Sequence, residues 1–212
     1  MPMTFRRSLS ALLTAAVVLV AGVSCDSPTA LKSGTLSLLL TDAPGDVVKA
    51  VVTIDQIYLQ PSENSDAGRI ILRDEDVTTD LLTLVDSTQS LISDVVIPAG
   101  SYSQLRFVIS GAYLEVEGEA AGTTTIFASS PSYAGLPEGA VVGGELQMPS
   151  FAQSGLKVQL PGDALVIGDD ASVTLVVDFD VAQSFGKAAG ASNRWVMTPV
   201  LKGTAPAPTP VP

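Results

Sequence analysis

Residues 95–109, VVIPAGSYSQLRFVI, decide the fold class that this sequence predicts. Three apolar residues lead into Pro98-Ala99-Gly100, which has the composition of a tight turn. After the turn, Leu105, Phe107 and Ile109 alternate with more polar neighbours, which is the period of a half-buried β-strand. The stretch therefore predicts two strands joined by a tight turn.

Strand patterns of this kind continue along most of the chain. The further predicted strands are residues 35–40, 48–59, 69–72, 113–117, 123–127, 145–148, 155–160, 164–167, 172–179 and 194–201. We expect the first three of them to be antiparallel neighbours, and Pro199 indicates an edge or a bulge in the last one. Because no helical period is sustained anywhere, the sequence predicts an all-β fold, a single antiparallel β-sandwich of roughly nine short strands.

Two segments fit this pattern less simply. Residues 80–85 fit either one helical turn capped by Asp80 or a short buried strand. Residues 129–144 are rich in Gly, Pro and Ser, which predicts a long excursion on the surface.

The N-terminal residues have the features of a secretory signal. Arg6 and Arg7 supply positive charge, residues 11–23 form an apolar run broken only by Thr14, and the run ends in small residues before Cys25. A helix that spans a bilayer needs about 20 apolar residues, so a retained transmembrane anchor is the weaker interpretation.

Cys25 is the only cysteine of the chain and follows Gly22-Val23-Ser24. This junction resembles the lipobox of bacterial lipoproteins, in which a small residue precedes a cysteine that is acylated and becomes the first residue of the mature chain. Gly22 stands where that pattern usually has Leu, and an ordinary signal peptide beside a chance cysteine is the alternative. The resemblance implies lipidation of Cys25 and an envelope protein anchored in a membrane, exposed to the periplasm or the cell surface.

Four regions follow from these signals. They are a signal peptide at residues 1–24, a lipid-proximal linker at 25–33, a β-sandwich domain at 34–203 and a tail at 204–212. The tail alternates proline with other residues, which favours extended polyproline II outside the fold.

Several segments together carry a wider family resemblance. They read GTLSLLLTDAP at 34–44, IPAGSY at 97–102, MPS at 148–150 with GLK at 155–157, DFDV at 178–181 and WVMTPVL at 195–201. In this order they resemble the domain of unknown function 4382 family, which is found in predicted bacterial and archaeal envelope proteins. The resemblance implies a prealbumin-like or immunoglobulin-like β-sandwich, and it implies no activity, ligand or catalytic residue.

Charge and composition exclude several functions. The chain has 22 acidic and 11 basic residues, so its surface repels phosphates and we expect no nucleic-acid partner. It contains no histidine, which excludes Ser-His-Asp, Cys-His and zinc-histidine sites. Glu115, Glu117 and Glu119 would share one strand face at steps of about 6.6 Å, near the separation that inverting glycosidases use. A solvated strand face is the simpler interpretation, so we expect no enzyme, and a carboxylate-based hydrolase is the second alternative.

Oxygen ligands make calcium the one cofactor to consider. Asp42 and Asp46 flank a turn that can converge their carboxylates on Ca²⁺, although Asp42 can instead bond the amides of the turn. The other acidic groups are Asp74-Glu75-Asp76 with Asp80, Asp169-Asp170, and the pair Asp178 and Asp180, for which outward-facing strand positions are the simpler interpretation.

Aromatic residues offer one more candidate site. Trp195 lies in an apolar strand and is expected in the core, whereas Tyr133 lies in the 129–144 excursion and is the candidate exposed aromatic for ligand binding. The sequence therefore predicts a lipid-anchored, non-enzymatic binding or structural module whose partner is an envelope protein or a glycan. A calcium- or carbohydrate-dependent adhesion module is the first alternative.

Overall fold

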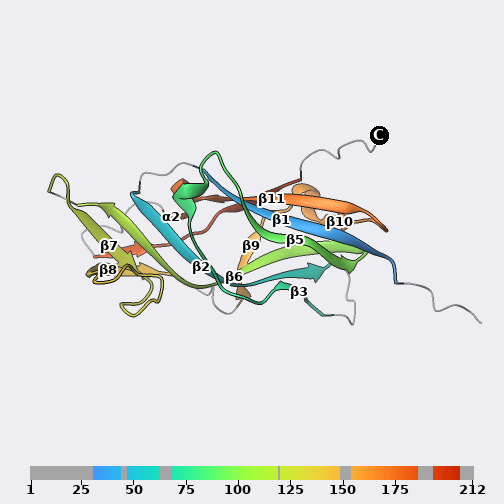
Figure 1. The fold of residues 1–212 in the computed structure, drawn as a ribbon, viewed down its shortest axis with the longest axis horizontal. Coiled ribbons are helices and arrows are strands. Elements are labelled where there is room, and N and C mark those ends of the chain that lie inside the picture. Colours follow the sequence, from blue (N-terminus) through green and yellow to red (C-terminus); the bar gives the residue numbers. More distant parts are fainter. Residues whose placement is uncertain are drawn as a thin grey trace, which may run out of the picture. The chain divides into compact units, whose positions relative to one another are not determined.

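The structure is a computed structural model that describes residues 31–43, 47–62, 68–118, 120–148, 154–185 and 193–205. All of them belong to the unit Leu31–Pro212. Within these ranges the strands form two sheets with a shared apolar core (Figure 1). The predicted all-β sandwich is confirmed, with thirteen strands rather than roughly nine in the part of the chain that is described.

The smaller sheet has four strands in the order β13 (Leu201–Thr204), β11 (Ser172–Asp180), β1 (Ser33–Ala43) and β5 (Gln89–Pro98). Strand β1 runs parallel to β11 and antiparallel to β5. Leu36, Leu38 and Leu40 alternate along β1 and are fully buried, so every second residue of this strand enters the core.

The larger sheet is built around β6 (Gly100–Glu117), an 18-residue strand. Strand β2 (Lys49–Pro61) pairs with β6 along nearly its whole length. On its other side, β6 pairs first with β10 (Leu165–Ile167) and β9 (Leu156–Val158), and then with β7 (Thr124–Ala128). The remaining strands are β3 (Ile70–Arg73), β4 (Val77–Asp80), β8 (Val142–Gln147) and β12 (Arg194–Val196).

The strand–turn–strand unit at residues 95–109 is present, but it is not a hairpin. Strand β5 lies in the smaller sheet and β6 in the larger one, so the turn between them carries the chain across the sandwich. The amide of Ala99 donates to the Lys32 carbonyl at 2.9 Å. Crossing between sheets lets Ile97 and Phe107 fill the same core from opposite sides, which pairing within one sheet would not do.

Two other predictions about the strands also differ from the structure. Residues 35–40 and 48–59 lie in different sheets, and only β2 and β3 are antiparallel neighbours as expected. Residues 194–201 are not one strand, because β12 joins the larger sheet and β13 the smaller one. Pro199 lies in the crossing between them, where no strand amide is needed.

The pairing is mixed rather than purely antiparallel. Strands β1 with β11, β7 with β8, and β8 with β12 are parallel. The predicted strand that follows the turn at residues 98–100 and the predicted strand at 113–117 are a single strand, β6. The helical interpretation of residues 80–85 is confirmed, because Leu81–Leu84 form a 3-10 turn (η1) and the Asp80 carboxylate accepts a hydrogen bond from the Leu82 amide at 3.3 Å.

Short helical segments complete the described fold. They are the 3-10 turn η2 (Pro161–Asp163) and the helix α2 (Val181–Phe185), which buries Phe185 against Phe179 of β11. In the ranges that the structure describes, no helix has the length and apolar character that crossing a membrane requires.

Candidate functional site

Residues 129–141 join two parallel strands, β7 and β8, and therefore must cross over a face of the sheet to return. They pack on the face of the larger sheet that points away from the main core. Here Val51, Tyr113 and Ala128 form a small outer cluster with Tyr133 and Leu136. The predicted surface excursion is thus present over residues 129–141, and strand β8 begins at Val142.

Tyr133 fastens this excursion to the sheet. Its hydroxyl lies 2.6 Å from Thr53 Oγ1, which in turn lies 2.7 Å from Thr78 Oγ1. The ring lies over Gly111, where a Cβ atom would come within 2.4 Å of it, so glycine makes the close approach possible. The ring of Tyr113 lies 6.4 Å away, centroid to centroid. The expectation of an exposed aromatic at Tyr133 is wrong, because these contacts half-bury the ring, and burial raises the pKa of its hydroxyl.

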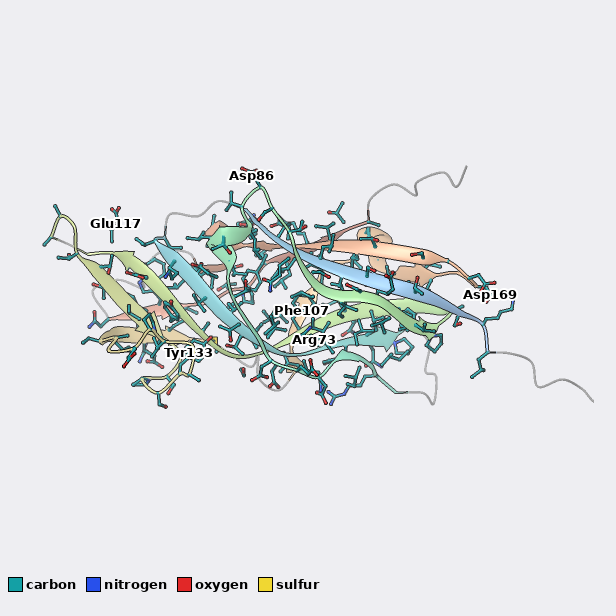
Figure 2. The ribbon with its side chains drawn as sticks, viewed as in Figure 1. Arg73, Asp86, Phe107, Glu117, Tyr133 and Asp169 are labelled. Carbon is teal, nitrogen blue, oxygen red and sulfur yellow. The ribbon has the colours of Figure 1, made fainter. Side chains whose placement is uncertain are left out.

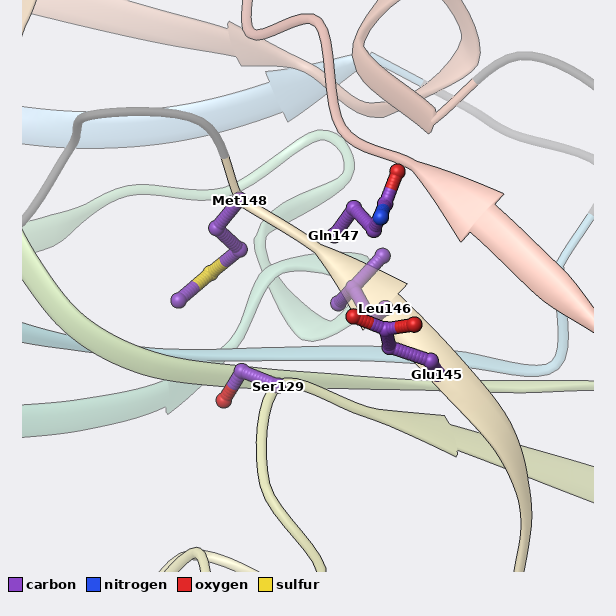
Figure 3. Close-up of a pocket in the computed structure, with 5 residues that line it drawn as sticks. All are labelled: Ser129, Glu145, Leu146, Gln147 and Met148. Carbon is purple, nitrogen blue, oxygen red and sulfur yellow. The ribbon is translucent and has the colours of Figure 1, made fainter.

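A hollow of about 440 Å³ lies beside this excursion, and Figure 3 shows the side chains around it. Glu145, Leu146, Gln147 and Met148 follow one another along and just after β8, while Ser129 comes from the start of the excursion. A second hollow, of about 690 Å³, also has Ser129 and Glu145 in its wall. Its other lining residues are small or apolar and include Pro131, Ala140, Val141 and Val142. We call the two together the distal hollow.

The polar groups of the distal hollow are held by neighbouring strands. Ser129 Oγ accepts a hydrogen bond from the Ala112 amide at 3.1 Å. Glu145 Oε2 lies 3.2 Å from Nε of Arg194, and about half of each of these two side chains is exposed. Val141 is 84% exposed at the rim. The surface thus combines apolar groups with one ion pair, which suits a ligand that presents both kinds of group.

Sequence reasoning pointed to the 129–144 excursion for ligand binding, and most of the wall of the second hollow comes from that excursion. It did not find the part of the hollow that residues 145–148 form. Residues 145–148 were expected only as a strand, and the hollow exists because β8 returns parallel to β7. The sequence carries no signal for that parallel return beyond the length of the excursion. Trp195 packs against the core beside Phe127, with ring centroids 5.9 Å apart, and the expectation of a core role is confirmed.

The proposed calcium ligands are only half described. Asp42 is 6% exposed, and its Oδ1 accepts a hydrogen bond from the Val181 amide at 3.2 Å, at the start of α2. Asp46 lies outside the described residues. Across the described ranges, no group of three or more His, Cys, Asp or Glu side chains is arranged to hold a metal ion. A calcium site at Asp42 and Asp46 stays a prediction.

Asp178 and Asp180 were expected to face outward from β11, and this is wrong for Asp180, which is 6% exposed. Its carboxylate accepts a hydrogen bond from the Gln183 amide at 3.0 Å and lies 3.4 Å from Lys202 Nζ. Asp178 is half-buried, and its Oδ1 has no hydrogen-bond partner among the described residues. Burial raises the pKa of Asp178, the charge of Asp180 raises it further, and Lys202 opposes both.

The other acidic groups also have local roles. A hydrogen bond with Asp76 raises the pKa of Asp55, and slight burial and the charges of Asp76 and Asp74 add to this effect. Glu115 accepts a hydrogen bond from Thr124 Oγ1 at 2.7 Å. Glu119, the third member of the predicted carboxylate row, lies outside the described residues.

A sequence profile described as "Domain of unknown function (DUF4382)" matches residues 33–199, which is most of the chain. The chain belongs to the DUF4382 family. No curated protein and no solved structure matches it. The match covers the larger sheet and all of the smaller sheet except β13, and it includes the excursion at 129–141 and the distal hollow of this DUF4382 domain.

Replacing Tyr133 by Phe should loosen the excursion. The change removes one hydroxyl from a half-buried hydrogen bond to Thr53, so we expect a loss of about 1 kcal/mol in the free energy of unfolding. Urea unfolding of Tyr133→Phe, Thr53→Val and the double variant measures the coupling between the two residues. If the loss of stability in the double variant equals the sum of the two single losses, the hydrogen bond is contradicted. Residues that interact give a double variant whose loss is smaller than that sum.

Replacing Asp178 by Asn should flatten part of the pH dependence of stability. A raised folded-state pKa means that the folded protein holds this proton more tightly, so stability falls as pH rises above the ordinary Asp value of 3.8. At pH 7 we expect Asp178→Asn to be more stable by under about 1 kcal/mol, since partial exposure screens the effect. The gain should shrink as pH falls through 3.8 and vanish well below it, where Asp178 is protonated in the folded and unfolded chain and is neutral like Asn. Thermal unfolding across this range is the measurement, and a gain that persists in acid would contradict the explanation.

Proposed function

We propose that this protein is a lipid-anchored, non-enzymatic module of the cell envelope that is attached through Cys25 and binds a partner at the distal hollow. The partner is an envelope protein or a glycan. The support is geometric. The start of β1 lies beside one end of β6, and the hollow lies well along the same strand.

The start of the described chain lies at one end of β6. The Lys32 carbonyl accepts a hydrogen bond from the Ala99 amide, next to Gly100, where β6 begins. The Ser33 carbonyl accepts from the Asp170 amide at 2.8 Å. In Figure 2, Asp169 marks this end of the domain, whereas Tyr133 and Glu117 lie toward the other end.

The distal hollow lies well along the same strand. The amide of Ser129 donates to the Ala112 carbonyl at 2.9 Å, which fixes the wall of the hollow beside residue 112 of β6. From Gly100 to Ala112 a strand extends about 40 Å at about 3.3 Å per residue. A binding surface at that distance from the end where β1 begins remains open to large partners.

The linker is short. Ser33 follows Cys25 by eight residues, which span at most about 29 Å when fully extended. An acyl group on Cys25, which precedes the described residues, would therefore hold the start of β1 close to the membrane and leave the hollow farther away.

Local contacts support a binding role over catalysis. Glu145 is paired with Arg194, Ser129 bonds the Ala112 amide, and Glu115 bonds Thr124. Each of these polar groups is already engaged by a neighbouring strand, which holds its side chain in one position. These side chains therefore suit positioning and recognition.

Replacing Cys25 by Ala should abolish membrane attachment. We expect radioactive palmitate to label the wild-type protein and Thr29→Ala, a control change in the same linker, but not Cys25→Ala. The unlabelled protein should move from the membrane fraction to the soluble fraction. Label that persists in Cys25→Ala would contradict the proposed anchor.

Binding at the distal hollow is tested with soluble envelope glycans, including peptidoglycan fragments, and an envelope protein extract. Amide shift changes in NMR titrations should cluster within residues 129–147. Replacing Val141 by Asp puts a charge at the edge of the distal hollow. We expect Val141→Asp to weaken binding at least about tenfold, because the charge opposes apolar contact with the ligand. Val48→Asp, at another exposed valine, is the control. Binding that Val141→Asp and Val48→Asp weaken equally would contradict this location.

A further inference from the structure

We infer that the end of the sandwich where β1 begins contacts the phospholipid surface directly through an apolar rim of Leu31, Val96 and Val166. This inference rests on the proposed lipid anchor at Cys25. The three side chains are 91%, 68% and 66% exposed, respectively. Large apolar side chains this exposed are unfavourable in water, and a bilayer interface provides a surface on which they can be buried.

Near this end of the sandwich, strands β5 and β10 carry apolar residues on both their core face and their outer face. In β10, Leu165 and Ile167 are buried, and Val166 between them points the other way. In β5, Ile97 is buried and the neighbouring Val96 is exposed. A strand with one solvated face normally carries polar residues on that face, so these two valines need another explanation.

The apolar character is confined to this end of β5. Farther along the strand, the exposed positions are Ser90, Ser93 and Asp94, all of them polar. The change from polar to apolar outward residues occurs close to the turn at residues 98–100. The pattern is therefore a local feature of the end and not a property of the whole strand.

The rim residues flank the start of β1, with Val96 on the outer face of the smaller sheet and Val166 on the outer face of the larger one. Val96 pairs with Thr35, near the beginning of β1, and Val166 pairs with Ser101, near the beginning of β6. Leu31 immediately precedes Lys32, whose carbonyl is bonded to Ala99 in the turn between β5 and β6. All three side chains thus belong to the end at which the chain arrives from Cys25.

The length of chain before β1 identifies the occupant as the bilayer. Ser33 follows Cys25 by eight positions, and a lipid on Cys25 would hold this end within about 29 Å of the membrane. A lipid tether of this length keeps the rim close to the bilayer. The bilayer is therefore the surface that is present at the highest effective concentration around the rim.

Charges at the rim indicate which lipids suit it. Lys32 lies 3.6 Å from Asp169, and the backbone of the neighbouring Asp170 bonds Ser33. Two aspartates against one lysine oppose a strongly anionic surface. The rim therefore fits zwitterionic headgroups, with shallow insertion of the three apolar side chains.

The contact is tested with the full lipidated protein on vesicles of phosphatidylcholine and phosphatidylethanolamine that carry bromine on the acyl chains. Tryptophan is introduced at the rim as Val166→Trp and, for the control, as Val141→Trp, at a valine of similar exposure by the distal hollow. Trp195 contributes the same background to both. We expect quenching at position 166 at least about threefold stronger than at position 141.

A second variant tests whether the introduced tryptophan itself causes the insertion. Adding Val96→Asp to Val166→Trp should lower the quenching at least about twofold, because a charge on the rim opposes insertion. Equal quenching at positions 166 and 141, with the protein still bound to vesicles, would overturn the contact and leave the anchor intact. If the protein is found to carry no acyl group, the anchor is disproved instead. Coupling Cys25 to a maleimide phospholipid then still tests the contact.

Discussion

The pairing of β2 with β6 is the constraint on which the rest of the structure depends. It runs from Lys49 opposite Glu115 to Pro61 opposite Tyr102, with shifts of register at three points. Every other strand of the larger sheet pairs with one of these two or is linked to them through β7 and β8. Because β6 is one long strand, the end where β1 begins and the distal hollow are parts of one continuous hydrogen-bonded ladder, which fixes their separation.

Local sequence patterns predicted the strands well and their partners poorly. Alternation in β6 depends only on which residues are apolar, so the burial of Leu105, Phe107 and Ile109 followed from the sequence. A short turn such as 98–100 serves equally for a hairpin and for a crossing between sheets. Only the facing sheet, assembled from β1 and β11, decides between them, and those strands lie far away in the sequence.

The candidate site was harder to predict for the same reason. Tyr133 was expected to be an exposed aromatic of the excursion, but its ring lies over Gly111 and its hydroxyl bonds Thr53. Nothing near Tyr133 in the sequence indicates those two partners. The aspartates show a similar limit, since Asp42 and Asp180 bond backbone amides at the start of α2, where spacing alone suggested turns or outward positions.

The central position of β1 affects when the domain can fold. Strand β1 is the first strand of the described chain, yet its parallel partner is β11, at residues 172–180. The smaller sheet therefore cannot close until nearly all of the domain is present, and contacts of such long sequence separation form slowly. The leucine-rich first strand is therefore synthesised long before its parallel partner, which lies in the last third of the protein. The delay before residues 33–43 pair with β11 is thus set by topology rather than by stability.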